Sequence, residues 1–388
     1  MYKLVNPVQH YSWGSTSSIP EILGVDNFEK KPFAELWMGA HSSAVSKVYI
    51  NDKIIPLNEL IAQNPNTVLG ENRKTLPFLL KILAATKPLS IQLHPNKDEA
   101  IKGFNRENKQ KIPIDAPFRN YKDNNHKPEI LCALSKFTAL KGFRSPKDIY
   151  DNFSQIESDV IRGQLNNFKS ELNPSGLESF FSYILKLSED KKNSLIRLAE
   201  SNFINSNKLH HQWLYRLIRE YAYDIGVLAP FFLNIILLEP NEAIFIKSGE
   251  LHAYLNGTGI ELMANSDNVL RGGLTQKHID KDELLSLTNF SQASTKLVKI
   301  KKMSNGEHTY ITNSNDFELS TIDLKKGIIF QSQYENKAKI LLCLKGNIKI
   351  TDKARKINLD CSQGESIFIP ANISNFVLEG EGAIFKAC

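Results

Sequence analysis

A glutamine and a histidine two positions apart could serve a metal ion together. Residues 90–95 read SIQLHP, so that Gln92 and His94 are separated by one leucine. On a strand, this spacing puts both side chains on one face and the apolar neighbours on the other. A histidine nitrogen and a glutamine oxygen on one face could then bind a metal. The alternative is an edge strand that shows a polar face to solvent.

A second group of reactive side chains occupies residues 123–129, which read DNNHKPE. It offers His126, Lys127 and Glu129 just before an apolar run at 130–134. Pro128 restricts the residue before it to extended conformations. This group could supply an acid, a base or a metal ligand, although a solvated loop would have the same composition.

Two later stretches add candidates of different kinds. His252 has apolar neighbours, so it is either a ligand or a histidine of the core. The stretch 259–277 is dense in polar residues and glycine, and its Gly272-Gly273 pair would let the backbone approach a ligand closely. Arg271 and Lys277 in this stretch could hold a phosphate or an oxyanion.

Composition narrows the class of protein. The chain has 388 residues, 41% hydrophobic and 23% charged, which is typical of a globular protein with two or three domains. A net charge of +6, without dense basic runs among aromatic residues, suits small anionic ligands and argues against nucleic acid. No apolar run could span a membrane and no signal-peptide pattern opens the chain. The four scattered cysteines lack CxxC spacing, so we expect reduced thiols in a cytoplasmic protein.

The chain falls into three zones. Residues 1–144 mix short β-like runs with short helices, and β-branched runs return from Phe231 onward. Residues 145–230 are predicted to be helical, beginning at a Ser145-Pro146 start signal. Trp213, Leu217, Tyr221 and Ile225 recur every four residues and indicate one apolar face.

The β-rich zone contains an internal repeat. Residues 241–249 resemble residues 363–372 when Glu242 is aligned with Glu365. In that register His252 falls on Asn375. The turn, strand and turn layout is similar to the half of a cupin motif that delivers a histidine to a metal. The later copy is therefore predicted to bind no metal, unless the similarity is only that of two hydrophobic strands.

Taken in order, these segments resemble the type I mannose-6-phosphate isomerases over most of residues 1–290. The resemblance rests on NPVQ at 6–9, Trp13-Gly14, AELWMG at 34–39, LPFLLK at 76–81, QLHPNK at 92–97, HKPE at 126–129 and the long stretch 257–280. Lys247-Ser248-Gly249 and Gln276 depart from what is usual in that family. These departures concern local loop geometry and leave the ligand motifs complete.

The resemblance implies one zinc ion per chain, with Gln92, His94, Glu129 and His252 as its ligands. It also places Ser90, Lys127, Glu261, Asp267 and Arg271 in the active-site pocket. Two imidazoles, one carboxylate and one neutral amide would leave zinc with net positive charge.

The implied reaction interconverts mannose 6-phosphate and fructose 6-phosphate through a cis-enediol(ate). It needs a cation where negative charge develops and a base that moves a proton between two carbons. We assign Arg271 to the enediolate or the phosphate. The predicted substrate-binding residues are Ser90, Lys127, Tyr254 and Lys277. Glu261, Asp267 and His126 all remain candidates for the base, and we favour a role shared near Asp267 and Lys127.

The predicted fold is mostly β with an α-helical insertion, built on two cupin (jelly-roll) β-barrels. Residues 1–144 and 231–299 would form a discontinuous catalytic domain, 145–230 a helical domain, and 300–388 a cupin-like domain without metal. We expect a monomer or weak homo-oligomer whose partner is a small sugar phosphate. An iron oxygenase of the cupin class would want a histidine-rich site, which is missing here. A catalytically dead sugar-binding protein would have lost ligands.

Overall fold

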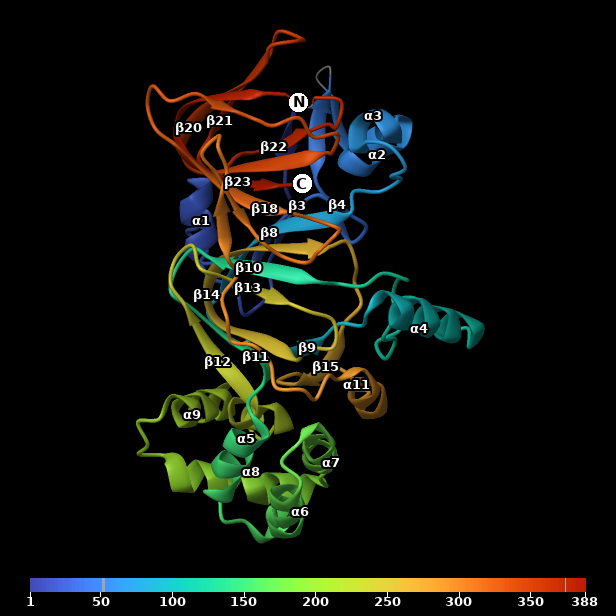
Figure 1. The fold of residues 1–388 in the computed structure, drawn as a ribbon, viewed down its shortest axis with the longest axis vertical. Helices are drawn as coiled ribbons and strands as arrows, with labels where there is room; N and C mark the ends of the chain where they lie inside the picture. The colour runs from blue at the N-terminus through green and yellow to red at the C-terminus, as the bar shows by residue number, and fades with distance from the viewer. Residues whose placement is uncertain (51–52, 374) are drawn as a thin grey trace.

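The computed structural model describes residues 1–50, 53–373 and 375–388. It is elongated, with three regions stacked along its longest axis (Figure 1). One sheet that contains the C-terminus lies at one end, a second sheet lies in the middle, and a group of helices lies at the other end. All strand pairs between named strands in the described residues are antiparallel.

The middle sheet carries the segments that the sequence motifs single out. Its main path runs β12-β11-β14-β8-β3-β2, and β9, β10, β13 and β15 pair beside it. Its described strands are β2 (Val8–Gln9), β3 (Glu35–Met38), β8 (Phe78–Ala85), β9 (Ile91–Leu93), β10 (Glu129–Ala133), β11 (Phe137–Phe143), β12 (Leu233–Leu238), β13 (Ala243–Ile246), β14 (His252–Ala264) and β15 (Leu270–Gly273). The central strand β14 pairs with β8, β9, β10 and β11, and so brings the two sequence halves together.

The second sheet is formed by both ends of the chain. Its described strands are β1 (Tyr2–Val5), β6 (Lys47–Ile50), β7 (Lys53–Pro56), β16 (Ile300–Lys302), β17 (Glu307–Tyr310), β18 (Leu319–Leu324), β19 (Phe330–Gln331), β20 (Lys339–Asp352), β21 (Ile357–Ser362), β22 (Ser366–Ile369) and β23 (Val377–Ala387). Strand β1 lies between β22 and β6, so the N-terminal segment extends the C-terminal sheet. A separate short pair joins β4 (Ala40–His41) to β5 (Ala44–Val45).

The helices fall into two groups. Those outside the insertion are α1 (Ser18–Leu23), α2 (Leu57–Gln63), α3 (Pro65–Leu69), α4 (Lys97–Lys109) and α11 (Lys281–Leu287). The stretch predicted to be helical, 145–230, contains α5 (Pro146–Ser154), α6 (Asp159–Ser170), α7 (Pro174–Leu185), α8 (Glu189–Phe203), α9 (Leu209–Tyr221) and η1 (Ile225–Leu228). The last helix, α10 (Ala229–Phe232), runs two residues past the predicted end, so the β segment begins at Leu233 and not at Phe231. Ser145 caps α5 by accepting a hydrogen bond from the Asp148 main-chain N–H.

The apolar face predicted for residues 213–225 is present in α9, but the helix ends one turn before the last residue of this face, Ile225. Trp213 and Leu217 of α9 are buried in the core, and Tyr221 and Ile225 pack against it. The helix stops at Tyr221, and Ile225 belongs to the short 3₁₀ helix η1 instead. The break occurs at Ala222, which has a positive φ of 49° that an α-helix cannot continue.

One hydrophobic core joins the helices to the strands of the middle sheet. Ile91 and Leu93 of β9 pack in the same cluster as Phe181 and Phe232 of the helical group. Because side chains alternate along a strand, burial of these two residues turns Gln92 to the opposite face. Within the described residues, no helix is long and apolar enough to cross a membrane.

Candidate metal centre and active site

Three metal-capable side chains meet at one point of the middle sheet. His94, Glu129 and His252 each offer one ligand atom, and these atoms lie within 4.8 Å of one another. The Nε2 atom of His94 is 3.2 Å from Oε1 of Glu129, and Nε2 of His252 is 3.5 Å from its Oε2. All three side chains are at most 3% exposed. Residues separated by more than 150 positions therefore form one compact donor set.

The second ring nitrogen of each histidine is held by the main chain. Nδ1 of His94 lies 2.7 Å from the carbonyl oxygen of Asn268, and Nδ1 of His252 lies 3.0 Å from that of Glu250. A carbonyl can only accept, so each Nδ1 carries the hydrogen and each Nε2 keeps its lone pair for the centre. Nε2 of His94 is buried and has no hydrogen-bond partner among the described residues.

Burial favours the neutral form of the His94 ring. Desolvation, together with the nearby Lys127 cation, lowers the pKa of His94 to about 4. A buried, neutral imidazole with an unused lone pair is the state that a metal ion requires. The donor set therefore fits a divalent metal on its geometry and on its protonation.

Gln92, the fourth candidate ligand, comes from the neighbouring strand β9. Strand β9 lies between β14 and β15. Gln92 is paired with His252 of β14 on one side and with Arg271 of β15 on the other. Gln92 also lines the cavity described below. Strand β9 ends at Leu93, so His94 stands one residue beyond the strand on which both side chains were predicted to lie.

A cavity of about 310 Å³ opens against the donor set. The predicted site residues that line it are Ser90, Gln92, Lys127, Glu129, His252, Tyr254, Glu261, Asp267 and Arg271. Polar and aromatic lining residues that the sequence did not assign to the site are Tyr11, Glu35, Trp37, Ser43, Lys81, Lys122 and Ser266, although Glu35, Trp37 and Lys81 lie within the family motifs. The cavity is large enough for a small polar molecule, and both charge signs face it.

Glu129 is shared between the donor set and the cavity. The Nζ atom of Lys127 is 2.9 Å from its Oε1, and the Tyr254 hydroxyl donates to its Oε2 at 3.3 Å. Burial opposes ionisation, but Lys127 and the two histidines outweigh it and hold the pKa of Glu129 well below its usual range. Glu129 is therefore a carboxylate at neutral pH.

Lys81, which also lines the cavity, forms a buried ion cluster with two carboxylates. Its ammonium group donates to Glu261 at 2.9 Å and lies 3.6 Å from Glu35, whose carboxylate accepts a hydrogen bond from the Trp37 ring. Burial alone would lower the pKa of Lys81, but the two carboxylates raise it above its ordinary value. Burial also raises the pKa of Glu261, against the opposing effect of Lys81. The sequence signal for this site was a single lysine inside the buried run of β8.

Asp267 lies at the more open side of the cavity. Its carboxylate accepts a hydrogen bond from the Ser43 hydroxyl at 2.9 Å and lies 3.5 Å from Nε2 of His41. Its side chain is 33% exposed, unlike the buried Glu261. An incoming molecule could reach Asp267 without displacing a buried ion pair.

Among the described residues, Arg271 and Lys122 are the cations of this cavity that have no acidic partner. Arg271 makes no ion pair with any described residue, and burial lowers the pKa of its guanidinium. Lys277 does not line the cavity. Burial lowers the pKa of Lys277, and the nearby charges of Arg271 and Lys122 lower it further. Unpaired cations near one mouth of a cavity favour an anionic ligand.

His126, one of the three candidate bases, does not line the cavity. Its Nε2 lies 2.8 Å from Oδ2 of Asp316, in the segment that follows β17. The reason is local, because Pro128 keeps Lys127 extended and consecutive side chains of an extended segment point in opposite directions. Lys127 takes the side that faces Glu129, so His126 takes the other.

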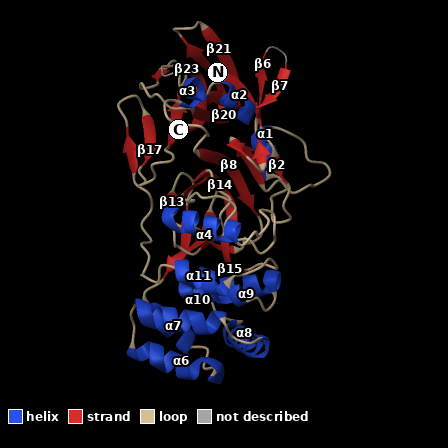
Figure 2. Cartoon of the chain, turned by 90° about the vertical axis from the view of Figure 1, so that its right-hand side faces the viewer, coloured by secondary structure: helices blue, strands red, loops and turns tan. Residues whose placement is uncertain are grey.

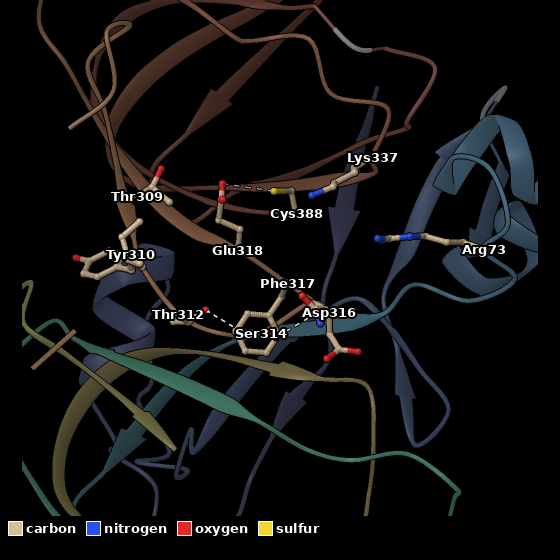
Figure 3. Close-up of a pocket in the computed structure, with 12 residues that line it drawn as sticks. Arg73, Thr309, Tyr310, Thr312, Ser314, Asp316, Phe317, Glu318, Lys337 and Cys388 are labelled. Atoms are coloured by element: carbon tan, nitrogen blue, oxygen red, sulfur yellow. Dashed lines mark hydrogen bonds between the residues drawn. The ribbon is translucent and has the colours of Figure 1, made fainter. Parts of the chain in front are cut away.

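Asp316 belongs to the wall of a second cavity, of about 220 Å³, between the two sheets (Figure 3). Arg73, from the N-terminal part of the chain, also lines this second cavity. Lys337 and Glu318 line it as well, on the C-terminal side of the chain. Glu318, Glu335 and Cys388 each bring one atom within 4.8 Å of the others. Glu335 already lies 3.5 Å from Lys339 and 3.7 Å from Lys386. The mixed charges of this cavity indicate no single class of ligand.

Comparison with known proteins decides the family. The chain is 37% identical to mannose-6-phosphate isomerase of Escherichia coli strain K12, over 100% of this chain and 99% of that protein. The chain belongs to the mannose-6-phosphate isomerase family. Residues 1–146 match the family described as Phosphomannose isomerase type I, catalytic domain, and residues 306–388 match Mannose-6-phosphate isomerase, cupin domain. The human mannose-6-phosphate isomerase is 30% identical over 100% of this chain and 98% of its own length.

Solved structures of family members agree. A zinc-bound mannose 6-phosphate isomerase superimposes with a TM-score of 0.92 at 35% identity, covering 100% of this chain and 98% of that one. A Salmonella typhimurium mannose 6-phosphate isomerase bound to fructose 6-phosphate and zinc gives a TM-score of 0.93 at the same identity and coverage. The resemblance inferred from the motifs is thus confirmed, and so is a mostly β fold with a cupin domain.

Proposed function

We propose that this chain is a zinc-dependent aldose–ketose isomerase that interconverts mannose 6-phosphate and fructose 6-phosphate. The observation that carries the proposal is the convergence of His94, Glu129 and His252 at a cavity that also presents an unpaired Arg271. Membership of the family supports the reaction, and the cavity supports a small anionic substrate.

The zinc would be held by Gln92, His94, Glu129 and His252. Two imidazole nitrogens, one carboxylate and one amide oxygen are all ligands that zinc accepts, and together they carry a single negative charge. When bound, zinc supplies a Lewis acid that polarises an oxygen of the substrate. The hydrogen bonds to Asn268 and Glu250 keep both Nε2 atoms aimed at that position.

The chain's own cations take up the negative charge of the substrate and of the cis-enediol(ate). We assign Arg271 to charge that develops on the sugar oxygens or to the phosphate, and Ser90, Lys127, Tyr254 and Lys277 to substrate binding. Lys122, which lines the same cavity, joins this group. Glu261 and Glu35 do not neutralise Arg271 or Lys122, because both carboxylates are paired with Lys81, whereas Lys127 is paired with Glu129.

The proton transfer requires a group that reaches the substrate's first two carbons. We place this role near Asp267 and Lys127, both of which line the cavity. Glu261 remains a third candidate, but its carboxylate is buried against Lys81. His126 is the weakest candidate of the original set because it pairs with Asp316 outside the cavity.

The architecture that we propose has two cupin barrels. Residues 1–144 and 231–299 would form the discontinuous catalytic domain, 145–230 the helical domain, and 300–388 a cupin-like domain without metal. The pairing of β14 with β8, β9, β10 and β11 supports a catalytic domain made from both sides of the insertion. We further propose a cytoplasmic enzyme that acts as a monomer or weak homo-oligomer.

A coupled assay tests the function directly. The purified chain should convert mannose 6-phosphate to fructose 6-phosphate, lose this activity after chelation and regain it with zinc. Absence of product with zinc-loaded protein would reject the isomerase. Full activity in metal-free protein would instead reject the role of zinc.

A further inference from the structure

The end of the helical insertion contacts two segments next to candidate site residues: the loop before β9, near Ser90, and the chain just after β15, near Arg271. The Tyr221 hydroxyl at the end of α9 donates a 2.5 Å hydrogen bond to the carbonyl of Pro88, two residues before Ser90. Three residues later, Asp224 reaches the chain just beyond β15. Figure 2 shows α9 and α10 next to α11 and β15 at this junction. The insertion is thus in direct contact with the back of the site.

Asp224 makes three hydrogen bonds to main-chain N–H groups there. Its Oδ1 accepts from Gly226 and from Leu274, each at 2.7 Å, and its Oδ2 accepts from Thr275 at 3.3 Å. The first bond caps η1, and the other two bind a segment that is 50 residues away in sequence. Hydrogen bonds to an ionised carboxylate are stronger than neutral ones.

The backbone held by Asp224 adopts an unfavourable conformation. Leu274 has a positive φ of 54°, although it is not a glycine, and its side chain is buried. The two segments also approach each other very closely, since a Cβ on Gly226 would lie 2.6 Å from the Leu274 nitrogen. A left-handed leucine persists only where its surroundings enforce it. The two bonds from Asp224 and the close packing of Gly226 are the enforcing contacts.

This segment controls where the cations point. Arg271 lies three residues before Leu274 and Lys277 three residues after it. The pairing of β15 with β9 holds the main chain from Leu270 to Gly273, and the contacts of Asp224 begin at the next residue, Leu274. Arg271 has no ion-pair partner among the described residues that could fix its guanidinium. The placement of Arg271 therefore depends on how β15 is held, by β9 along the strand and by Asp224 at its end.

We propose that Asp224 is a positioning residue for the isomerase: it locks the segment 271–277 so that Arg271 meets the anionic groups of the substrate. This inference rests on the proposed function. It also gives the helical insertion a role in substrate recognition, which neither the motifs nor the cavity lining reveal. The proposal concerns Asp224 acting through Arg271, because Asp224 is not among the residues that line the cavity.

Asp224→Ser separates the bond that caps η1 from the bonds to Leu274 and Thr275. A serine hydroxyl can still cap η1 at Gly226, but it is too short to reach Leu274 and Thr275. We expect kcat/KM to fall about 10- to 100-fold, the loss typical of a misplaced binding group, with zinc content unchanged. Asp224→Asn keeps an oxygen acceptor for Gly226 and Leu274 and should retain most of the activity. Asn173→Ala removes the cap of α7 in the same insertion and should leave kcat/KM near wild type.

A double-mutant cycle separates positioning from a general loss of stability. In the Arg271→Ala background, Asp224→Ser should reduce kcat/KM less than about threefold, because the group it positions is already absent. Independent, multiplying losses would overturn the proposal, and so would a wild-type kcat/KM for Asp224→Ser.

Hydrogen exchange provides a readout that does not need activity. In zinc-loaded protein, Asp224→Ser should speed exchange of the amides of Leu274 and Thr275 by at least tenfold, while Asn173→Ala should not. Unchanged exchange of these two amides would refute the role of Asp224 in holding this segment, even if the wild-type chain were inactive. An inactive wild type with the expected exchange pattern would instead count against the proposed function, while the role of Asp224 in holding the segment would stand.

Discussion

The Nδ1 atom of His94 bonds the main-chain oxygen of Asn268 at 2.7 Å, and the side chain of the same asparagine holds the loop before Glu129. Its amide donates to the carbonyls of Asp123 and Asn125, each at 2.8 Å, and accepts from the Lys122 N–H at 2.8 Å. The side chain is fully buried. One residue therefore ties a candidate metal ligand to the segment that carries the next one.

Asn268→Ala should weaken zinc binding although it removes no ligand. The variant keeps the carbonyl that holds His94 but frees the loop 122–125. We expect the zinc dissociation constant to rise about 10- to 100-fold, as is typical when a partner of a ligand is lost. Competition with a fluorescent zinc chelator measures the change. Asn152→Ala is the matched control, because the buried Asn152 amide also donates to a main-chain carbonyl, that of Phe231, but lies in α5 of the helical insertion.

His252→Ala and Arg271→Ala should fail in different ways. Loss of His252 removes one of four ligands, so both zinc and nearly all activity should disappear. Arg271→Ala should retain zinc and lose activity mainly in kcat, by about 10²- to 10³-fold, if the guanidinium meets charge that grows in the transition state. Metal analysis and steady-state kinetics check both variants. A large rise in KM at constant kcat would instead identify Arg271 as a phosphate clamp.

The ligand candidates could be predicted from the sequence because they lie in short motifs whose residue types already limit the chemistry. The helices of the insertion could also be predicted, since their apolar spacing and start signals are local. Lys81 was not recognised, because an isolated lysine in a buried strand reveals its carboxylate partners only once β8 pairs with β3 and β14. Asp224 was missed for the same reason, as its partners lie 50 residues further along the chain. The place of β1 beside β22 likewise depends on tertiary contacts.

Lys81→Met should destabilise the fold strongly. It leaves Glu261 and Glu35 buried without their cation, and breaking a buried ion pair in this way costs about 3–5 kcal/mol. Thermal unfolding of the zinc-loaded protein measures the loss. Lys87→Met, which breaks the exposed pair with Glu220, should change stability by less than about 1 kcal/mol. Equal effects of the two variants would show that the buried cluster is not stabilising.

The stability of the helical insertion should fall as the pH drops from about 6.5 to about 4. Burial lowers the pKa of His211 to about 4, whereas the unfolded chain keeps the ordinary value near 6.5. In that window the unfolded state therefore binds more protons than the folded state, and stability that is complete above pH 6.5 is lost as the pH decreases. The loss from this residue is at most about 3.5 kcal/mol, because the two pKa values differ by about 2.5 and each pH unit between them is worth about 1.4 kcal/mol. His211→Phe keeps an aromatic ring stacked on Phe203 and removes the titrating group. Its melting temperature should depend less on pH than that of the wild type between pH 4 and 6.5, and parallel curves for the two proteins would contradict the assignment.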